Sequence, residues 1–166
     1  MIRAFCNDDG RTFCFESGKN VIENQGVWKL LYDHVDKPLH EGVSQKIFFV
    51  AADAHCRANN IDITPEANSG AGPVDFKLST GYHNRAVVEL KLSTNSRILH
   101  GYTEQLEAYK RGERTDAGYL VILDVGGSSK QIDRVLKLEA AARAANTPHS
   151  PVTVIDATRK KSASKI

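Results

Sequence analysis

The sequence lacks the patterns of several protein classes. Its three cysteines, Cys6, Cys14 and Cys56, form no CxxC pair and leave an odd number, which argues against a disulfide framework or a zinc ribbon. No apolar run approaches the length of a membrane span, and the first residues do not resemble a secretory signal. We therefore expect a reduced, cytoplasmic, soluble protein that has no membrane partner.

Common nucleotide-binding and hydrolase motifs are also missing. There is no GxxxxGK[ST] or GxGxxG fingerprint, and the glycine-rich peptides SGAGP and VGGSS are short turns without the required spacing. The six histidines are scattered without an HExxH or HxH pattern, and no serine or cysteine has partners at a recognisable spacing. A P-loop, a zinc hydrolase and a serine or cysteine hydrolase are therefore not indicated.

Length and charge indicate one globular domain of 166 residues with a near-neutral body. Hydrophobic residues make up 41% of the chain, which is enough for a core. The net charge is 22 − 20 = +2, and the tail 157–166 carries four cations and no acid. We interpret the tail as a solvated, frayed end, with a phosphate-tethering arm as the alternative.

The first third of the chain predicts a hairpin followed by two helices. Apolar runs on both sides of NDDG predict a hairpin appendage over residues 1–18, which would suit a domain of a larger protein. Ser17 or Asn20 would cap a helix that runs to about Asp33, and a longer amphipathic helix is expected over 41–59. Its expected apolar stripe is Val43, Ile47, Val50, Ala51 and Ala54, widened by Phe48 and Phe49.

The rest of the chain predicts strands joined by helices. IDIT indicates a strand, and VDFKLS and AVVELKLS a hairpin. A helix over 98–111, ended by Gly112, precedes the continuously apolar AGYLVILDV, which is typical of a strand covered on both faces. A helix from Ser128 or Ser129 to about Ala145 and a last strand, VTVID, follow. The order predicts an α/β fold with a mixed central sheet flanked by helices.

The hairpin contains two acids that interrupt its apolar pattern. Folding it about Tyr82 pairs residues whose numbers sum to 164, so that Asp75 lies opposite Glu89. Alternation places Val74 and Phe76 on a core face, and both acids on the other face together with Lys91. Two carboxylates at this spacing repel each other unless one is protonated or a cation lies between them.

A divalent cation would resolve this conflict, because Mg²⁺ takes carboxylate and carbonyl oxygens as ligands. Asp75, Glu89 and the carbonyl of Leu90 are the candidate ligands, and Lys91 would orient a water molecule or neutralise a phosphate. The alternative is a solvated hairpin face on which the two acids are paired by chance.

These residues resemble the PD-(D/E)xK nuclease superfamily. Its acid-and-ExK pattern is similar to Pro73–Asp75, with one residue between proline and acid, followed by Glu89–Lys91. The QxxxY element of the RecB-like branch resembles Gln105 and Tyr109, which are four apart and share a helix face. Glu41 matches the helix acid that often completes the metal shell in this family. The resemblance implies a restriction-endonuclease-like αβββαβ core over residues 39–125.

The resemblance implies a Mg²⁺- or Mn²⁺-dependent nuclease that hydrolyses phosphodiester bonds by metal-activated water. Its implied metal ligands are Asp75, Glu89, Leu90 and Glu41. Lys91 would position or activate the water, Gln105 would orient Lys91 or the phosphate, and Tyr109 would support Gln105. DNA is favoured over RNA because it is the commoner substrate of the family. The cations that could contact phosphates are Lys77, Arg85, Arg97, Lys110, Arg111 and Arg114.

Two other hypotheses remain open. The same fold could be a catalytically inactive module that binds nucleic acid or a partner protein, although the intact acid–acid–lysine set argues against lost activity. It could also be a structural subunit of a larger defence or repair complex. Cleavage of both strands of a duplex would favour a homodimer.

Overall fold

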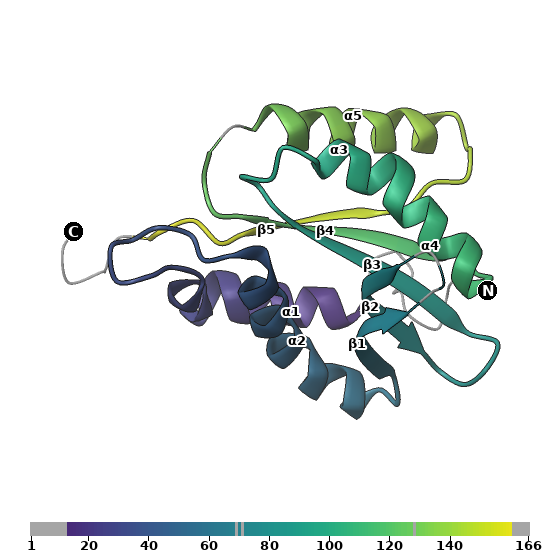
Figure 1. The fold of residues 1–166 in the computed structure, drawn as a ribbon, viewed down its shortest axis with the longest axis horizontal. Helices are drawn as coiled ribbons and strands as arrows, with labels where there is room; N and C mark the ends of the chain where they lie inside the picture. The colour runs from purple at the N-terminus through teal and green to yellow at the C-terminus, as the bar shows by residue number, and fades with distance from the viewer. Residues whose placement is uncertain (1–12, 69, 71, 128, 161–166) are drawn as a thin grey trace.

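A computed structural model of the chain describes residues 13–68, 70, 72–127 and 129–160. A five-stranded mixed sheet of order β1-β2-β3-β4-β5 forms its centre (Figure 1). The first three strands are antiparallel neighbours, and β4 and β5 continue the sheet in parallel with β3. The strands are β1 (Asp62–Asn68), β2 (Pro73–Ser79), β3 (Arg85–Leu92), β4 (Gly118–Asp124) and β5 (Val152–Asp156).

Helices cover both faces of this sheet (Figure 1). One face carries α1 (Phe13–Asn24), the 3₁₀ helix η2 (Val27–Leu31) and α2 (Glu41–Ala58). The other carries α3 (Ile98–His100), the π-helical turn η3 (Gly101–Gln105), α4 (Leu106–Glu113) and α5 (Lys130–Ala144). The predicted α/β class with a mixed sheet flanked by helices is confirmed. In the described part of the chain, no helix has the length and apolar character needed to cross a membrane.

The sheet separates two hydrophobic clusters, one on each face. The larger cluster is built around Phe15, Phe48 and Phe76, whose rings contact one another in series with centroid distances of 5.8 and 5.5 Å. The second cluster lies under α3, α4 and α5. Every residue of β4 before its last is buried, because β4 is an inner strand covered on both faces. This is the environment that its continuous apolar run predicts.

The N-terminal region differs from the prediction. Residues 13–18 belong to helix α1, so the second strand of the expected hairpin is wrong from Phe13 onwards, and residues 1–12 lie outside the described residues. Phe15 and Ile22, two helical turns apart, are both buried in the larger cluster, which favours a helix. The helix expected to reach Asp33 ends at Asn24 because Gly26 turns the chain with φ 82°.

The apolar stripe predicted for α2 is correct for the members that pack in or on the larger cluster, namely Ile47, Phe48, Phe49 and Ala51. It is wrong for Val43, Val50 and Ala54, which are exposed. The buried residues recur every fourth position, at Ser44, Phe48, Ala52 and Cys56. Val43 and Val50 are instead 40% and 73% exposed. The helix orients to bury the ring of Phe48 between Phe15 and Phe76, since a large aromatic side chain contributes more buried area than a valine.

The predicted hairpin register is confirmed from Phe76↔Val88 to Ser79↔Arg85, pairs whose numbers sum to 164. The backbone ladder stops before Asp75, so Asp75 and Glu89 are not a ladder pair. Val74 packs with Val87 in the second cluster, which corrects its predicted place beside Phe76. The alternation of side chains along β2 therefore breaks between Phe76 and Val74, at the residue where the ladder with β3 stops.

The later elements agree with the prediction except at two ends. The helix expected to end at Gly112 continues to Glu113, and Arg114 takes the left-handed conformation with φ 53°. Residues 157–160 contact the body rather than fraying: Ala157 is buried, and Arg159 forms an ion pair of 2.8 Å with Asp36. The remainder of the tail, residues 161–166, lies outside the described residues.

Candidate functional site

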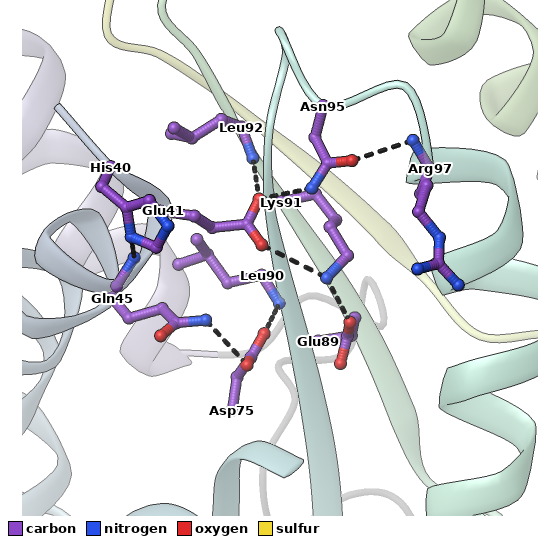
Figure 2. Close-up of polar contacts among 11 residues, drawn as sticks. His40, Glu41, Gln45, Asp75, Glu89, Leu90, Lys91, Leu92, Asn95 and Arg97 are labelled. Atoms are coloured by element: carbon purple, nitrogen blue, oxygen red, sulfur yellow. Dashed lines mark hydrogen bonds and ion pairs between the residues drawn. The ribbon is translucent and has the colours of Figure 1, made fainter. Parts of the chain in front are cut away.

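Three acids and one lysine meet where β2 and β3 separate, beside the start of α2. We call this group, which consists of Glu41, Asp75, Glu89 and Lys91, the carboxylate site (Figure 2). Alternation in β3 directs Glu89 and Lys91 to one face. Helix α2 brings Glu41 to them across a separation of about fifty residues in the chain.

Lys91 connects two of the three acids. Its Nζ lies 2.6 Å from Glu89 Oε1 and 3.4 Å from Glu41 Oε1. The whole residue is only 7% exposed. Burial lowers the pKa of the Lys91 ammonium, but the charge and hydrogen bond of Glu89 and the charge of Glu41 together raise it above its ordinary value. Lys91 therefore remains a cation inside the site.

Glu41 joins the start of α2 to the end of β3. Its Oε2 accepts hydrogen bonds from the N–H of Leu92 at 3.1 Å and from Asn95 Nδ2 at 2.9 Å (Figure 2). Asn95 Oδ1 in turn accepts the N–H of Arg97 at 2.8 Å. Asn95 was not predicted as a site residue, because nothing in its local sequence distinguishes it from an ordinary turn asparagine. Glu41 thus has partners for both carboxylate oxygens.

Asp75 is also held at both oxygens. Its Oδ1 accepts from Gln45 Nε2 and its Oδ2 from the N–H of Leu90, each at 2.7 Å (Figure 2). Burial raises the pKa of Asp75 to about 6, with smaller contributions from the charges of Glu41 and Glu66 and an opposing one from the Leu90 hydrogen bond. The i, i+4 spacing of Glu41 and Gln45 was the available sequence signal for Gln45.

Glu89 carries the least compensated charge of the site. It is 1% exposed, and its Oε2 is buried without a hydrogen-bond partner in the described part of the chain. Burial, followed by the charge of Asp75, raises the pKa of Glu89 to about 7 although Lys91 opposes the shift. Three ionised carboxylates against one ammonium give −3 + 1 = −2. The site therefore favours an additional cation or a bound proton.

The helix after β3 borders the site on its other side. Tyr109 is buried, its phenol is hydrogen-bonded by the side chain of Gln105, and its pKa is raised by burial and then by the charges of Glu89 and Asp75. The predicted shared face of Gln105 and Tyr109 is thus confirmed. Gly101 was missed by the sequence reasoning: a Cβ there would lie 3.1 Å from Lys91 Cε. A glycine inside a helical pattern was the signal that could have indicated it.

The structure brings together the predicted acids and the predicted lysine, but it does not show a ready three-ligand metal site. Among the described residues, no group of three or more His, Cys, Asp or Glu is placed to hold a metal ion. The Lys91 ammonium contacts both Glu41 and Glu89. Leu90 takes part through its N–H, and the role of its carbonyl as a ligand stays a prediction. Glu66 lines a cavity together with Asp75, and its charge contributes to the raised pKa of Asp75.

Several of the predicted phosphate-binding cations have carboxylate partners in the described structure. Lys77 and Arg85 both pair with the buried Glu113, at 2.7 and 3.7 Å. Lys110 pairs with Glu107 at 2.8 Å. Arg97 is exposed next to the carboxylate site (Figure 2), which makes it the better placed candidate for a phosphate contact.

Comparison with protein families finds a match for this chain. Residues 13–127 match the family described as "Domain of unknown function (DUF8371)". No curated protein and no solved structure matches the chain. The matched residues span more than half of the chain and include the complete carboxylate site, so the protein belongs to the DUF8371 family.

Proposed function

We propose that the protein is a metal-dependent nuclease of the PD-(D/E)xK superfamily, which hydrolyses phosphodiester bonds of nucleic acid, with DNA favoured. The observation that carries the proposal is the buried, unpartnered Oε2 of Glu89 beside Asp75 and Lys91. Acids with raised pKa values that are gathered around a buried lysine are typical of catalytic sites. A purely structural ion-pair network would leave no charged oxygen unpaired at this depth.

The order of the elements supports the same proposal. From α2 to β4 the chain follows helix, three strands, helix, strand, with β1, β2 and β3 antiparallel and β4 parallel to β3. This order agrees with the αβββαβ core that the resemblance implies. The contact between Gln105 and Tyr109 beside the acids is also consistent with the QxxxY element.

By their chemistry the carboxylate oxygens would suit Mg²⁺ or Mn²⁺, although the described residues are not placed as a three-ligand metal site. The unpartnered Oε2 of Glu89 is a free carboxylate donor, and Asp75 is an acid close enough to raise the pKa of Glu89. Glu41 and the carbonyl of Leu90 are the further candidate ligands. When bound, such an ion would supply Lewis-acid chemistry to the phosphodiester and neutralise its charge.

The other groups would position the reactants. The Lys91 ammonium can donate a hydrogen bond to the attacking water or to a phosphate oxygen once it turns from one of its two carboxylate partners. Glu41, whose Oε1 lies 3.4 Å from that ammonium, helps to hold it beside Glu89. Gln45 holds Asp75 in one orientation through its 2.7 Å hydrogen bond. Gln105, oriented by Tyr109, borders the side chain of Lys91 across Gly101.

The direct test is a nuclease assay with DNA and RNA in Mg²⁺ or Mn²⁺. We expect Lys91→Ala to lower the rate on the order of 10²–10³-fold, because it removes one preorganised donor. Lys19→Ala is the matched control: Lys19 is also a part-buried lysine in an ion pair, but its partner is Glu23 rather than a site acid. Equal products from wild type and Lys91→Ala would remove the catalytic proposal.

The second candidate is a catalytically inactive module that binds nucleic acid or a partner protein. It is favoured by one observation, namely that Lys91 already pairs with Glu89 and Glu41. Calorimetric titration with Mn²⁺ separates the two candidates. Binding that is lost in Glu89→Ala supports the nuclease, and absence of binding to the wild type supports the module.

A further inference from the structure

A cavity of about 200 Å³ adjoins the carboxylate site between α2 and the β1–β2 pair. Asp75 and Gln45 line the cavity and are also hydrogen-bonded to each other. The cavity therefore shares Asp75 with the carboxylate site. Neither the fold nor the proposed roles of the site residues require it. We call it the α2–β1 cavity and define it by Gln45, Lys46, Phe49, Pro65, Glu66 and Asp75.

The size and the walls of the cavity suit one flat ring system. Its volume is below the roughly 300–1,000 Å³ typical of pockets that enclose a whole small-molecule ligand. Phe49 from α2 and Pro65 from β1 provide apolar surface. The half-buried Phe49 packs on the larger core cluster, so its ring has a fixed support. Aromatic side chains with fixed rings are the usual stacking surfaces for bases in single strands.

The charges at the cavity indicate which part of a nucleotide enters it. Glu66 and Asp75 are both acids in its wall, so a phosphate group would be repelled. A neutral base is not repelled, and its amino or ring N–H groups can donate to the carboxylate of Glu66. The exposed Lys46 at the same cavity would attract the phosphate that follows the base.

We propose that the α2–β1 cavity holds one unstacked nucleobase of the strand whose phosphodiester lies at the carboxylate site. The inference rests on the proposed function for the position of that phosphodiester. A base inside the cavity has left its helical stack, and leaving the stack costs least in a single strand or at a frayed end. The substrate class is therefore single-stranded nucleic acid, or a duplex end that can open.

The test measures binding, so it does not depend on hydrolysis. A fluorescein-labelled single-stranded decanucleotide is titrated by anisotropy with Ca²⁺ as the divalent cation. The same strand is then tested with one abasic residue placed at each position in turn. The proteins are wild type, Phe49→Ala, Phe49→Tyr and the matched control Val50→Ala, which changes the neighbouring, 73% exposed residue of the same helix.

We expect an abasic residue at one position to weaken binding by wild type about tenfold, the size of one base stack. Phe49→Ala should lose the same factor on the intact strand and become insensitive to the abasic residue at that position. Phe49→Tyr, which keeps an aromatic ring, and Val50→Ala should behave as wild type. A fully paired duplex of the same sequence should bind more weakly.

Two results would overturn the proposal that the α2–β1 cavity is a subsite for one base. One is that each abasic residue changes the affinity of wild type and of Phe49→Ala equally at every position. The other is that no strand binds. The position dependence of the wild type alone is decisive if Phe49→Ala fails to fold. Parallel assays in Mg²⁺ distinguish the two proposals. Hydrolysis without base dependence removes the subsite and keeps the nuclease, whereas base-dependent binding without hydrolysis keeps the subsite and removes the nuclease.

Discussion

Lys91 is the residue on which the balance of the carboxylate site depends. Its ammonium offsets part of the charge of Glu89 and Glu41, yet burial still raises the pKa of Glu89 to about 7 and that of Asp75 to about 6. The two acids therefore cost stability while they are ionised. This cost is expected where a site is organised to bind a ligand rather than to stabilise the fold.

The raised pKa values predict how stability changes with pH in metal-free protein. The ordinary pKa values are 4.5 for Glu89 and 3.8 for Asp75, so the folded state binds these protons more tightly than the unfolded chain. Above pH 7 both acids are charged in both states and the destabilisation is complete. As the pH falls through 7 and 6, the folded state takes up protons and becomes more stable, by on the order of 1–3 kcal/mol.

Urea unfolding in EDTA at pH 8 and at pH 5 measures this effect. The midpoint of wild type should be higher at pH 5, and Glu89→Gln should show a smaller difference because it removes one titrating group. Asp33 and Asp156, whose pKa values are lowered, act in the opposite direction at more acidic pH. A wild-type midpoint that falls steadily from pH 8 to pH 5 would contradict the raised pKa values.

At the scale of the elements, the π-helical turn Gly101–Gln105 lies against β3, where Gly101 faces the side chain of Lys91. It interrupts the helical segment between α3 and α4 directly beside Lys91. Single π turns are frequent at functional sites. Gly101 has no Cβ, and this allows the aliphatic part of Lys91 to lie against the helix backbone.

Gly101→Ala should therefore alter the site more than the fold. The new Cβ would lie 3.1 Å from Lys91 Cε, so the lysine has to move by a few tenths of an ångström. We expect nuclease activity to fall about tenfold, while the higher helix propensity of alanine offsets the strain to within about 1 kcal/mol of stability. Activity and thermal unfolding are measured together.

Gly112→Ala, at an exposed position of α4, is the control for Gly101→Ala. It makes the same change in helix propensity but does not contact the carboxylate site. Unchanged activity of Gly101→Ala, with the protein folded, would show that the contact with Lys91 is not required.

At the scale of the whole molecule, the aromatic series of Phe15, Phe48 and Phe76 joins α1, α2 and the sheet. This contact also determines where α2 begins relative to β3, and so where Glu41 and Gln45 meet the other acids. The packing of α2 on one face of the sheet thus helps to position the carboxylate site, which lies where β2 and β3 separate.

Phe48→Ala should destabilise the protein by about 3–5 kcal/mol, because it leaves a cavity at a fully buried position. Chemical denaturation measures the change. Val50→Ala on the exposed side of the same helix should cost less than about 0.5 kcal/mol. Equal effects of the two substitutions would mean that α2 does not dock through Phe48.

The sequence by itself determined the features that depend on neighbouring residues along the chain. The register of β2 and β3, the buried character of β4 and the common face of Glu89 and Lys91 follow from a period of two and from turn chemistry. Asp75, Glu89 and Lys91 were identified in this way, whereas Glu41 was named through the family resemblance. Those patterns are local, and they hold as long as the strands stay paired.

Only the tertiary structure decided the features that arise between distant segments. The buried face of α2, the helical start at Phe13, the place of Val74, and the roles of Asn95, Gln45 and Gly101 all depend on such contacts. Phe48 outweighs the valines of α2 because docking between two aromatic rings contributes more buried area. The periodicity of α2 cannot show which of its residues will be buried, because the rings that Phe48 packs against, Phe15 and Phe76, lie tens of residues away in the chain.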